Sequence, residues 1–346
     1  MEKNNFFKFI FTSQSNCGEI ALNEIFKIFK NAKFCGWINS GVGIVQVDYN
    51  FRDISNKLKK EQVIFIRHIC PIDVEVEING ECSDINILKS TMKDLIHLLD
   101  FNKSASIQTR IISSKKIFTY KKFDINQALS NELENLGLEI NVKKPEQIVS
   151  IILKDNKALI GISLASENLS DWSGGEHRFL RLENQISRAE FKLLEVLDVF
   201  NIDLSKYKSA LDLGAAPGGW THVLLENNLN VTAVDPAELH PSIKFNKNVI
   251  HFKGLAQEFL KKNNFFDVIV NDMRMDTKES CLLMGLASNY LNKDGIAIMT
   301  LKLPKKGMQK LTSNSLKILK QWYNILYVRQ LFHNRSEVTV VLKLKN

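Results

Sequence analysis

Long apolar runs are missing from this sequence of 346 residues, and none approaches the roughly 20 residues that a helix needs to cross a bilayer. We expect no leader peptide either, because the opening letters MEKNNFFKFIF alternate as a β-strand does. Internal repeats and low-complexity tracts are also absent. Apolar residues make up 45% and charged residues 24%, as in ordinary soluble domains. We therefore expect a cytoplasmic protein without a membrane partner.

Cysteine is scarce and dispersed. The five cysteines form no CxxC pair and stand at positions Cys17, Cys35, Cys70, Cys82 and Cys281. The seven histidines show no metal-binding spacing either. This pattern argues against a disulfide framework and a zinc site, and it suits a reducing compartment. We expect small buried thiols and no metal ion.

Acidic residues are scarce in only one part of the chain. The formal net charge is +8, yet residues 1–200 hold 26 Lys+Arg and 26 Asp+Glu. Residues 201–346 hold 20 Lys+Arg and 12 Asp+Glu, and the last 46 residues hold 10 Lys+Arg and 1 Asp+Glu. Charge concentrated in this way indicates a polyanionic partner such as RNA, although a solvated lysine-rich face would give the same count.

From about residue 200, short apolar runs alternate with helical patterns. We expect strands at 209–213, 230–234, 248–252, 266–270 and 295–301. This rhythm predicts βαβ units and hence an α/β fold with a parallel sheet. Two further strands, 323–332 and 337–344, are separated by only four residues, which permits an antiparallel hairpin and no crossover. A mostly parallel sheet closed by such a hairpin is the Rossmann-like arrangement of the class I methyltransferases.

The first half of the chain has a different pattern. A strand at 8–14 and a helix at 19–30 indicate a ferredoxin-like α+β unit. A second small unit follows, whose strands at 146–164 form a hairpin with Asp155 and Asn156 in its turn. The expected division is a ferredoxin-like domain at 1–100, a second domain at 101–168, a polar linker at 169–186 and the α/β domain at 187–346.

The stretch LDLGAAPGGW, residues 211–220, gathers small residues where the first α/β strand meets a helix. Glycine permits a tight turn and lets a ligand approach main-chain N–H groups. Ligands of open parallel sheets bind beyond the carboxyl ends of the strands. The spacing GxxxGG differs from the GxGxxG of dinucleotide sites, and no Walker lysine follows. Because the loop also has few positive groups for a pyrophosphate, S-adenosylmethionine is the expected cofactor.

The expected cofactor contacts come from this loop and from the ends of neighbouring strands. Asp235 stands 23 residues after Asp212, where an acid can bind ribose hydroxyls. Trp220 is expected either to pack beneath the loop or to contact the cofactor. The full set of candidates is Asp212, Gly214, Ala215, Ala216, Pro217, Gly218, Gly219, Trp220, Asp235, Gly254 and Asp272.

DLGAAPGGW resembles motif I of the FtsJ/RrmJ-type RNA ribose 2′-O-methyltransferases. Four further segments agree with that family: SRAEFKLLE (187–195), NDM (271–273), LKLP (301–304) and HNRSEVTVV (333–341). The resemblance places the family's K-D-K-E tetrad on Lys192, Asp272, Lys302 and Glu337. It covers about 186–344, while 1–165 more loosely resembles the RNA-binding THUMP region that some members carry.

Topology by itself also brings these four residues together. The S-x-x-E capping box at 187–190 predicts that a helix begins there and runs antiparallel to the strand that follows. Its start, which carries Lys192, then lies at the carboxyl edge of the sheet. Asp272 follows the fourth strand and Lys302 the fifth. Glu337 begins a strand of opposite direction, so all four residues are expected at one edge.

The chemistry needs such a cluster, because a ribose 2′-hydroxyl is a weak nucleophile at neutral pH. Methyl transfer is an in-line displacement, so the enzyme must orient the hydroxyl and stabilise the developing alkoxide. Lys302 is the candidate group at the 2′-oxygen. Lys192 would lower its pKa while the two acids would raise it, so a base and a cationic stabiliser both remain open. The other three residues are expected to orient and tune Lys302.

Absent motifs narrow the reaction further. Methylation of exocyclic base nitrogens usually goes with [DN]PP[FYW] after the fourth strand, where this chain has NDMRM. Methylation of cytosine C5 needs a nucleophilic cysteine, whereas Cys281 lies in an expected helix and packs there. The segment FKGLAQEF (252–259) has no acid directly after the third strand. Adenine contacts near Gly254 are therefore expected from the backbone.

The resemblance implies S-adenosylmethionine-dependent 2′-O-methylation of an RNA ribose by an enzyme whose THUMP region presents the RNA. LKLPKK and RQLFHNRSEVTV are most similar to the members that act on a cytidine of 23S rRNA. A tRNA substrate is an alternative, because THUMP regions occur in tRNA-modifying enzymes. A catalytically silent RNA-binding or ribosome-assembly factor is another. The residues do not determine an oligomeric state, and a monomer is the expectation.

Overall fold

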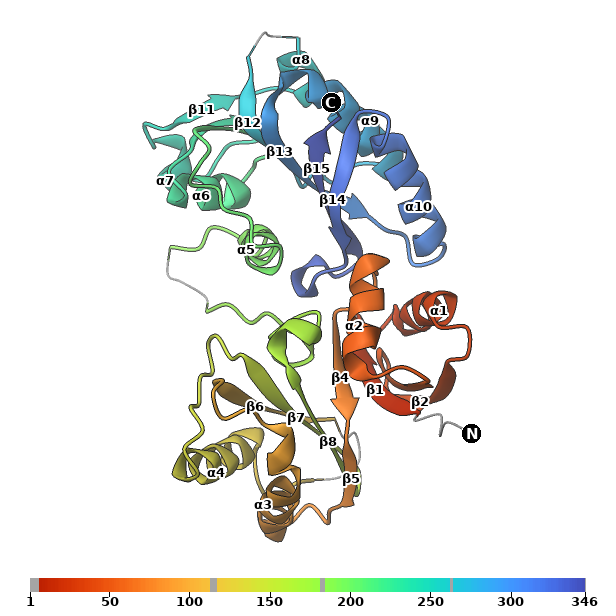
Figure 1. Ribbon diagram of the computed structural model, residues 1–346. Coiled ribbons are helices and arrows are strands. Elements are labelled where there is room, and N and C mark those ends of the chain that lie inside the picture. Colours follow the sequence, from red (N-terminus) through yellow and green to blue (C-terminus); the bar gives the residue numbers. More distant parts are fainter. Residues whose placement is uncertain (1–5, 113–116, 181–183, 262–263, 346) are drawn as a thin grey trace. The chain divides into compact units, whose positions relative to one another are not determined.

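The computed structural model describes residues 6–112, 117–180, 184–261 and 264–345. The chain divides into two compact units, Met1–Glu176 and His177–Asn346 (Figure 1). The boundary falls inside the expected linker 169–186, of which residues 181–183 lie outside the described ranges. Within those ranges, no helix has the length and apolar character needed to cross a membrane.

The first sheet of the N-terminal unit has the strand order β2-β3-β1-β4, with β1 antiparallel to both of its neighbours. Its elements are β1 (Phe7–Thr12), α1 (Gly18–Ile28), β2 (Lys33–Asn39), β3 (Val42–Val47), α2 (Phe51–Lys60) and β4 (His68–Ile72). A β-α-β-β-α-β succession of this kind is that of a ferredoxin-like unit.

The second sheet has the order β5-β8-β7-β6, in which only the β6–β7 pair is parallel. Its elements are β5 (Val74–Glu77), α3 (Ser83–Leu95), β6 (Ala105–Ile111), α4 (Lys122–Asn135), β7 (Gln147–Lys154) and β8 (Lys157–Leu164). The expected two-residue turn at 155–156 is confirmed, because Lys154 pairs with Lys157 across it.

Sheet membership changes directly after β4. Residues 73–100 were expected in the ferredoxin-like domain, but β5 pairs with β8 and α3 packs into the core of the second sheet through Leu88 and Met92. A further apolar cluster joins the two sheets, with Ile10 and Cys70 of the first against Ile152 of the second.

The C-terminal unit is built on a seven-stranded sheet of order β11-β10-β9-β12-β13-β15-β14. The strands are β9 (Ser209–Leu213), β10 (Asn230–Val234), β11 (Val249–Phe252), β12 (Phe266–Asn271), β13 (Leu291–Lys302), β14 (Tyr323–Arg329) and β15 (Glu337–Leu344). The first five run parallel, and β15 runs antiparallel to both β13 and β14. This confirms the expected α/β fold with a C-terminal antiparallel hairpin.

One helix, α5, precedes β9 and the other helices connect the strands, as Figure 1 shows. These helices are α5 (Glu190–Val199), α6 (Gly219–Glu226), α7 (Pro241–Lys244), α8 (Ala256–Phe259), α9 (Thr277–Ala287) and α10 (Met308–Leu319). The chain runs from β9 outward to β11 and then returns to β12 on the other side of β9. The switch in direction therefore falls between β9 and β12, where open α/β sheets bind ligands.

Candidate active site

The glycine-rich turn lies directly after β9, at this switch point. Gly214 has a φ of +77° and Gly218 a φ of +114°, conformations that favour glycine. A Cβ on Gly214 would lie 2.3 Å from Met273 Cγ, and one on Gly219 would lie 2.2 Å from Ser187 Oγ. The turn therefore needs glycine because the segments after β12 and before α5 approach its backbone closely.

Two acids support the turn from beneath and beside it. Asp212 is 2% exposed and accepts a hydrogen bond from Thr221 Oγ1 at 2.7 Å. Burial, only partly offset by that hydrogen bond, raises the pKa of Asp212 to about 7. Asp235 accepts from the backbone N–H of Ala216 at 3.1 Å and of Ala237 at 2.8 Å. Asp212 is thus a buried support, and Asp235 fixes the turn to the end of β10.

The remaining cofactor candidates occupy distinct places at this edge. Trp220 is 3% exposed, lies in the apolar core and donates its indole N–H to the Ala189 carbonyl at 2.8 Å. It packs beneath the turn, which is the first of its two expected roles. Ala215 is buried in a small apolar cluster, and the Pro217 carbonyl accepts from the His240 N–H at 2.8 Å. Gly254 follows β11, two strands away from β9.

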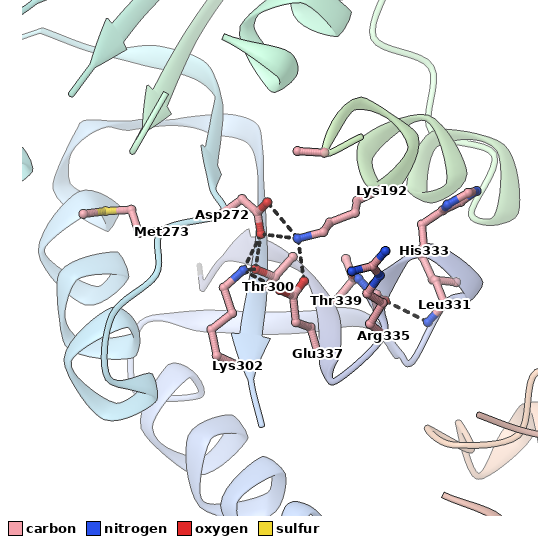
Figure 2. Close-up of polar contacts among 12 residues, drawn as sticks. Lys192, Asp272, Met273, Thr300, Lys302, Leu331, His333, Arg335, Glu337 and Thr339 are labelled. Carbon is pink, nitrogen blue, oxygen red and sulfur yellow. Dashed lines mark hydrogen bonds and ion pairs between the residues drawn. The ribbon is translucent and has the colours of Figure 1, made fainter. Parts of the chain in front are cut away.

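The structure brings all four tetrad residues together beside this turn (Figure 2). Lys302 Nζ lies 2.6 Å from Asp272 Oδ1 and 2.8 Å from Glu337 Oε1. Lys192 Nζ lies 2.9 Å from Asp272 Oδ2 and 2.7 Å from Glu337 Oε2. Each lysine therefore bridges both carboxylates, and each carboxylate bridges both lysines. The exposed fractions of the four side chains are between 15% and 22%.

The close pairing sets the charge state of at least two members. Burial works against the charge of Asp272, but Lys302 and Lys192 outweigh it and lower the pKa of this carboxyl. Burial likewise opposes the charge of Lys192, but Asp272 and Glu337 outweigh it and raise the pKa of this amine. Both residues are held in their charged forms at neutral pH.

Helix α5, which carries Lys192, is held by Glu190 to the segment before it and to α6. Glu190 is 5% exposed, and its carboxylate accepts from the N–H groups of Ile186 at 2.6 Å and Ser187 at 2.8 Å. Its other oxygen pairs with His222 of α6 at 3.0 Å. The hydrogen bonds of the predicted capping box are present, because Ser187 Oγ accepts from the Ala189 N–H at 3.2 Å and Glu190 accepts from the Ser187 N–H. The regular helix begins at Glu190, three residues later than predicted.

Strand pairing positions Lys302 and Glu337. The two residues are direct partners in the antiparallel register of β13 and β15. Thr300, which sequence reasoning missed, donates to Asp272 Oδ1 at 2.6 Å and accepts from Lys302 Nζ at 2.9 Å. Since side chains two apart in a strand share a face, the spacing of Thr300 and Lys302 was a usable signal.

Glu195 is a second residue that sequence reasoning missed. It is 1% exposed and accepts from the backbone N–H groups of Phe332 at 2.7 Å and His333 at 2.8 Å. The turn held in this way leads into Glu337 at the start of β15. Glu195 lies three residues after Lys192 on α5, so one helix contacts the tetrad both directly and through this turn.

Comparisons with known proteins agree with this geometry. A model of the FtsJ-like methyltransferase family matches residues 185–331. A protein of Psychromonas ingrahamii named Ribosomal RNA large subunit methyltransferase M is 30% identical over 320 residues, covering 86% of this chain and 83% of that protein. The chain belongs to the ribosomal RNA large subunit methyltransferase M family.

Other relatives extend the comparison. A protein of the same name from Pseudoalteromonas translucida is 27% identical over 66% of this chain and 67% of its own length. The protein MJ1257 of Methanocaldococcus jannaschii is 31% identical over 47% of this chain and 48% of its own. As a member of the methyltransferase M family, the chain is an enzyme of methyl transfer.

Across the described ranges, no group of three or more His, Cys, Asp and Glu side chains is placed to hold a metal ion.

Proposed function

We propose that this enzyme transfers a methyl group from S-adenosylmethionine to the 2′-oxygen of a ribose in large-subunit ribosomal RNA, at a cytidine. The observation that carries this proposal is the alternating arrangement of Lys192, Asp272, Lys302 and Glu337 next to the glycine-rich turn. The rRNA substrate is supported by the names of the relatives, and the cytidine by the resemblance of the LKLPKK and RQLFHNRSEVTV segments.

The residues around the turn fit a sulfonium cofactor. Residues 211–220 contain no lysine or arginine that could bind a pyrophosphate. Instead, Asp235 stands beside the turn at the end of β10, where a carboxylate suits a cation. The turn 214–219, Asp235 and the backbone near Gly254 would hold the cofactor, which supplies an electrophilic methyl group when it is bound.

The tetrad's geometry favours Lys302 as a cationic stabiliser. An ammonium group has three N–H donors, and Lys302 Nζ has three acceptors within 2.9 Å, on Asp272, Glu337 and Thr300. Exchanging one of these contacts for the 2′-oxygen places a positive charge where alkoxide character develops. Methylation replaces the 2′ O–H bond by an O–CH3 bond, so one proton leaves. The carboxylates of Asp272 and Glu337 are the bases next to Lys302.

The N-terminal unit is proposed to bind the RNA. The relative from Psychromonas ingrahamii aligns over 86% of this chain, so the alignment extends well beyond the methyltransferase domain. We propose a ferredoxin-like domain within 1–100, a THUMP-like RNA-binding domain within 101–168, a linker at 169–186 and the methyltransferase domain at 187–346. The positive charge of residues 201–346, 20 Lys+Arg against 12 Asp+Glu, supports a polyanionic substrate for that domain.

The test is transfer of tritiated methyl groups from S-adenosylmethionine to total RNA of cells that lack the protein. We expect label in the large rRNA, recovered after digestion as 2′-O-methylcytidine, and none with Lys302→Ala. Label in tRNA would assign the enzyme a different substrate. Cofactor binding without labelled RNA would indicate a silent RNA-binding or assembly factor.

A further inference from the structure

Arg335 has a backbone conformation that arginine avoids. Its φ is 54° and its ψ is −108°, a region that a side chain disfavours and that glycine adopts freely. The chain on its C-terminal side is fixed, because Gln330 Nε2 donates to the Arg335 carbonyl at 3.1 Å and the Leu303 N–H donates to the Ser336 carbonyl at 2.9 Å. A strained residue held in place by its surroundings points to a use for its side chain.

Arg335 also lies close to the tetrad. It precedes Glu337 by two residues, so their Cα atoms are at most about 7 Å apart. The side chain is exposed, and among the residues that the structure describes its guanidinium has no hydrogen bond or ion pair. In the view of Figure 2, Arg335 lies between the tetrad and His333.

The tetrad itself offers no attraction for an anion. Its two lysines are each paired with both carboxylates, so the four charges cancel. A ribose that enters this site nevertheless brings a phosphate with it, since the carbon that bears the 2′-hydroxyl is bonded to the carbon that bears the 3′-phosphodiester. A further cation close to the tetrad would attract this phosphate and hold the RNA backbone.

We infer that Arg335 binds the phosphodiester next to the target ribose and thereby places the 2′-hydroxyl at Lys302. Guanidinium groups bind phosphate through two parallel N–H···O bonds, and such contacts position a nucleic acid without reading its sequence. Arg335 is thus a substrate-positioning residue of this enzyme. The inference rests on the proposed function, because it assumes an RNA ribose at the tetrad.

The experiment compares Arg335→Gly, Arg335→Lys and Lys293→Ala with the wild-type full-length protein. Glycine suits the backbone at position 335, so Arg335→Gly removes the side chain and the strain together. Lys293→Ala removes the same charge from an exposed residue near the start of β13, at the edge of the sheet opposite Lys302. Each protein is tested with an unmodified transcript of the large rRNA for binding at several salt concentrations and for methyl transfer.

For Arg335→Gly we expect about tenfold weaker RNA binding, a similarly raised KM for RNA and a kcat within about threefold of wild type. The logarithm of the RNA association constant decreases with the logarithm of the salt concentration. We expect this slope to become less steep by the contribution of one phosphate contact, roughly 0.7 to 0.9. Arg335→Lys should restore part of the affinity, because it keeps the charge and loses the bidentate geometry. Cofactor affinity should not change, and the melting temperature should stay equal or rise.

Values for Arg335→Gly that match Lys293→Ala would overturn the inference, as would a lowered melting temperature or a loss of cofactor binding. The binding measurement also separates this inference from the proposed function. If the wild type transfers no methyl group but Arg335→Gly still shows the reduced affinity and salt slope, phosphate binding by Arg335 stands and the proposed reaction falls. If the wild type methylates rRNA and Arg335→Gly behaves as the control does, the proposed reaction stands and phosphate binding by Arg335 falls.

Discussion

Lys302 and Glu337 face each other as register partners across the antiparallel pair β13–β15, with Lys302 Nζ 2.8 Å from Glu337 Oε1. The C-terminal hairpin thus brings the last member of the tetrad to the edge where the parallel strands end. Without this reversal of strand direction, Glu337 would begin at the opposite edge of the sheet. The non-parallel addition to the sheet is therefore part of the candidate active site.

Glu337→Gln should slow methyl transfer by about 10- to 100-fold. The substitution keeps the size of the side chain but removes the carboxylate that Lys192 and Lys302 share, so Asp272 is their remaining carboxylate partner in the tetrad. Single-turnover methyl transfer with saturating RNA and cofactor measures the effect. Asp294→Asn is the control, because its side chain is 96% exposed near the start of β13. A rate equal to that of the control would remove Glu337 from the site.

Asp212→Asn should stabilise the protein increasingly as the pH rises from about 4 to 7. The pKa of Asp212 is raised to about 7 in the folded protein, whereas an unfolded aspartate has a pKa of about 3.9. Between these values unfolding releases a proton, so the stability contribution of Asp212 is complete below about pH 4 and is lost by about pH 7. Asparagine keeps an acceptor for the Thr221 hydroxyl.

Urea unfolding at a series of pH values, without cofactor, measures this difference. The free energy of unfolding of Asp212→Asn relative to wild type should rise by a few kcal/mol between pH 4 and 8, since each pKa unit corresponds to about 1.4 kcal/mol. Asp294→Asn should show no comparable trend. A difference that is flat with pH would show that the carboxylate of Asp212 is not disfavoured by its burial.

Gly214→Ala should destabilise the enzyme more than Gly307→Ala and should also weaken cofactor binding. The two glycines have nearly equal φ values, +77° and +76°. A Cβ at position 214 would lie 2.3 Å from Met273 Cγ, whereas one at position 307 would meet nothing within 4 Å. We expect a loss of about 1 kcal/mol at position 307 and at least twice that at position 214.

Thermal unfolding and calorimetric titration with S-adenosylmethionine measure both effects. Equal losses of stability in the two variants would mean that the turn tolerates a displaced Met273. An unchanged cofactor affinity for Gly214→Ala would place the cofactor away from this turn.

The sequence predicted the α/β half of the fold closely because its buried parallel strands are short uninterrupted apolar runs. The bounds of β9 and β10 agree with the prediction to the residue, and β13 begins four residues earlier than expected. The convergence of the tetrad could also be predicted, because strand direction alone decides the edge at which a strand ends. Local pattern and topology are sufficient for features of this kind.

Features that depend on distant partners could not be predicted. The pairing of β5 with β8 joins Val74 to Ile160, and no local pattern marks that contact. Glu195 accepts from backbone N–H groups about 140 residues away. Almost every residue has a backbone N–H, so the residue types do not indicate which one is the donor. The strain at Arg335 is equally invisible, because arginine is not a residue that predicts a positive φ.

The most direct test of the central claim is the rate of a single turnover by Lys302→Ala on unmodified large rRNA, with Lys293→Ala as the charge-matched control. Removing one preorganised donor from a developing oxyanion typically costs about 100- to 1,000-fold in rate. We predict a loss of at least about 100-fold, with dissociation constants for S-adenosylmethionine and RNA within about threefold of wild type. A rate within tenfold of the control, at full occupancy of both substrates, would contradict a role for Lys302 at the 2′-oxygen.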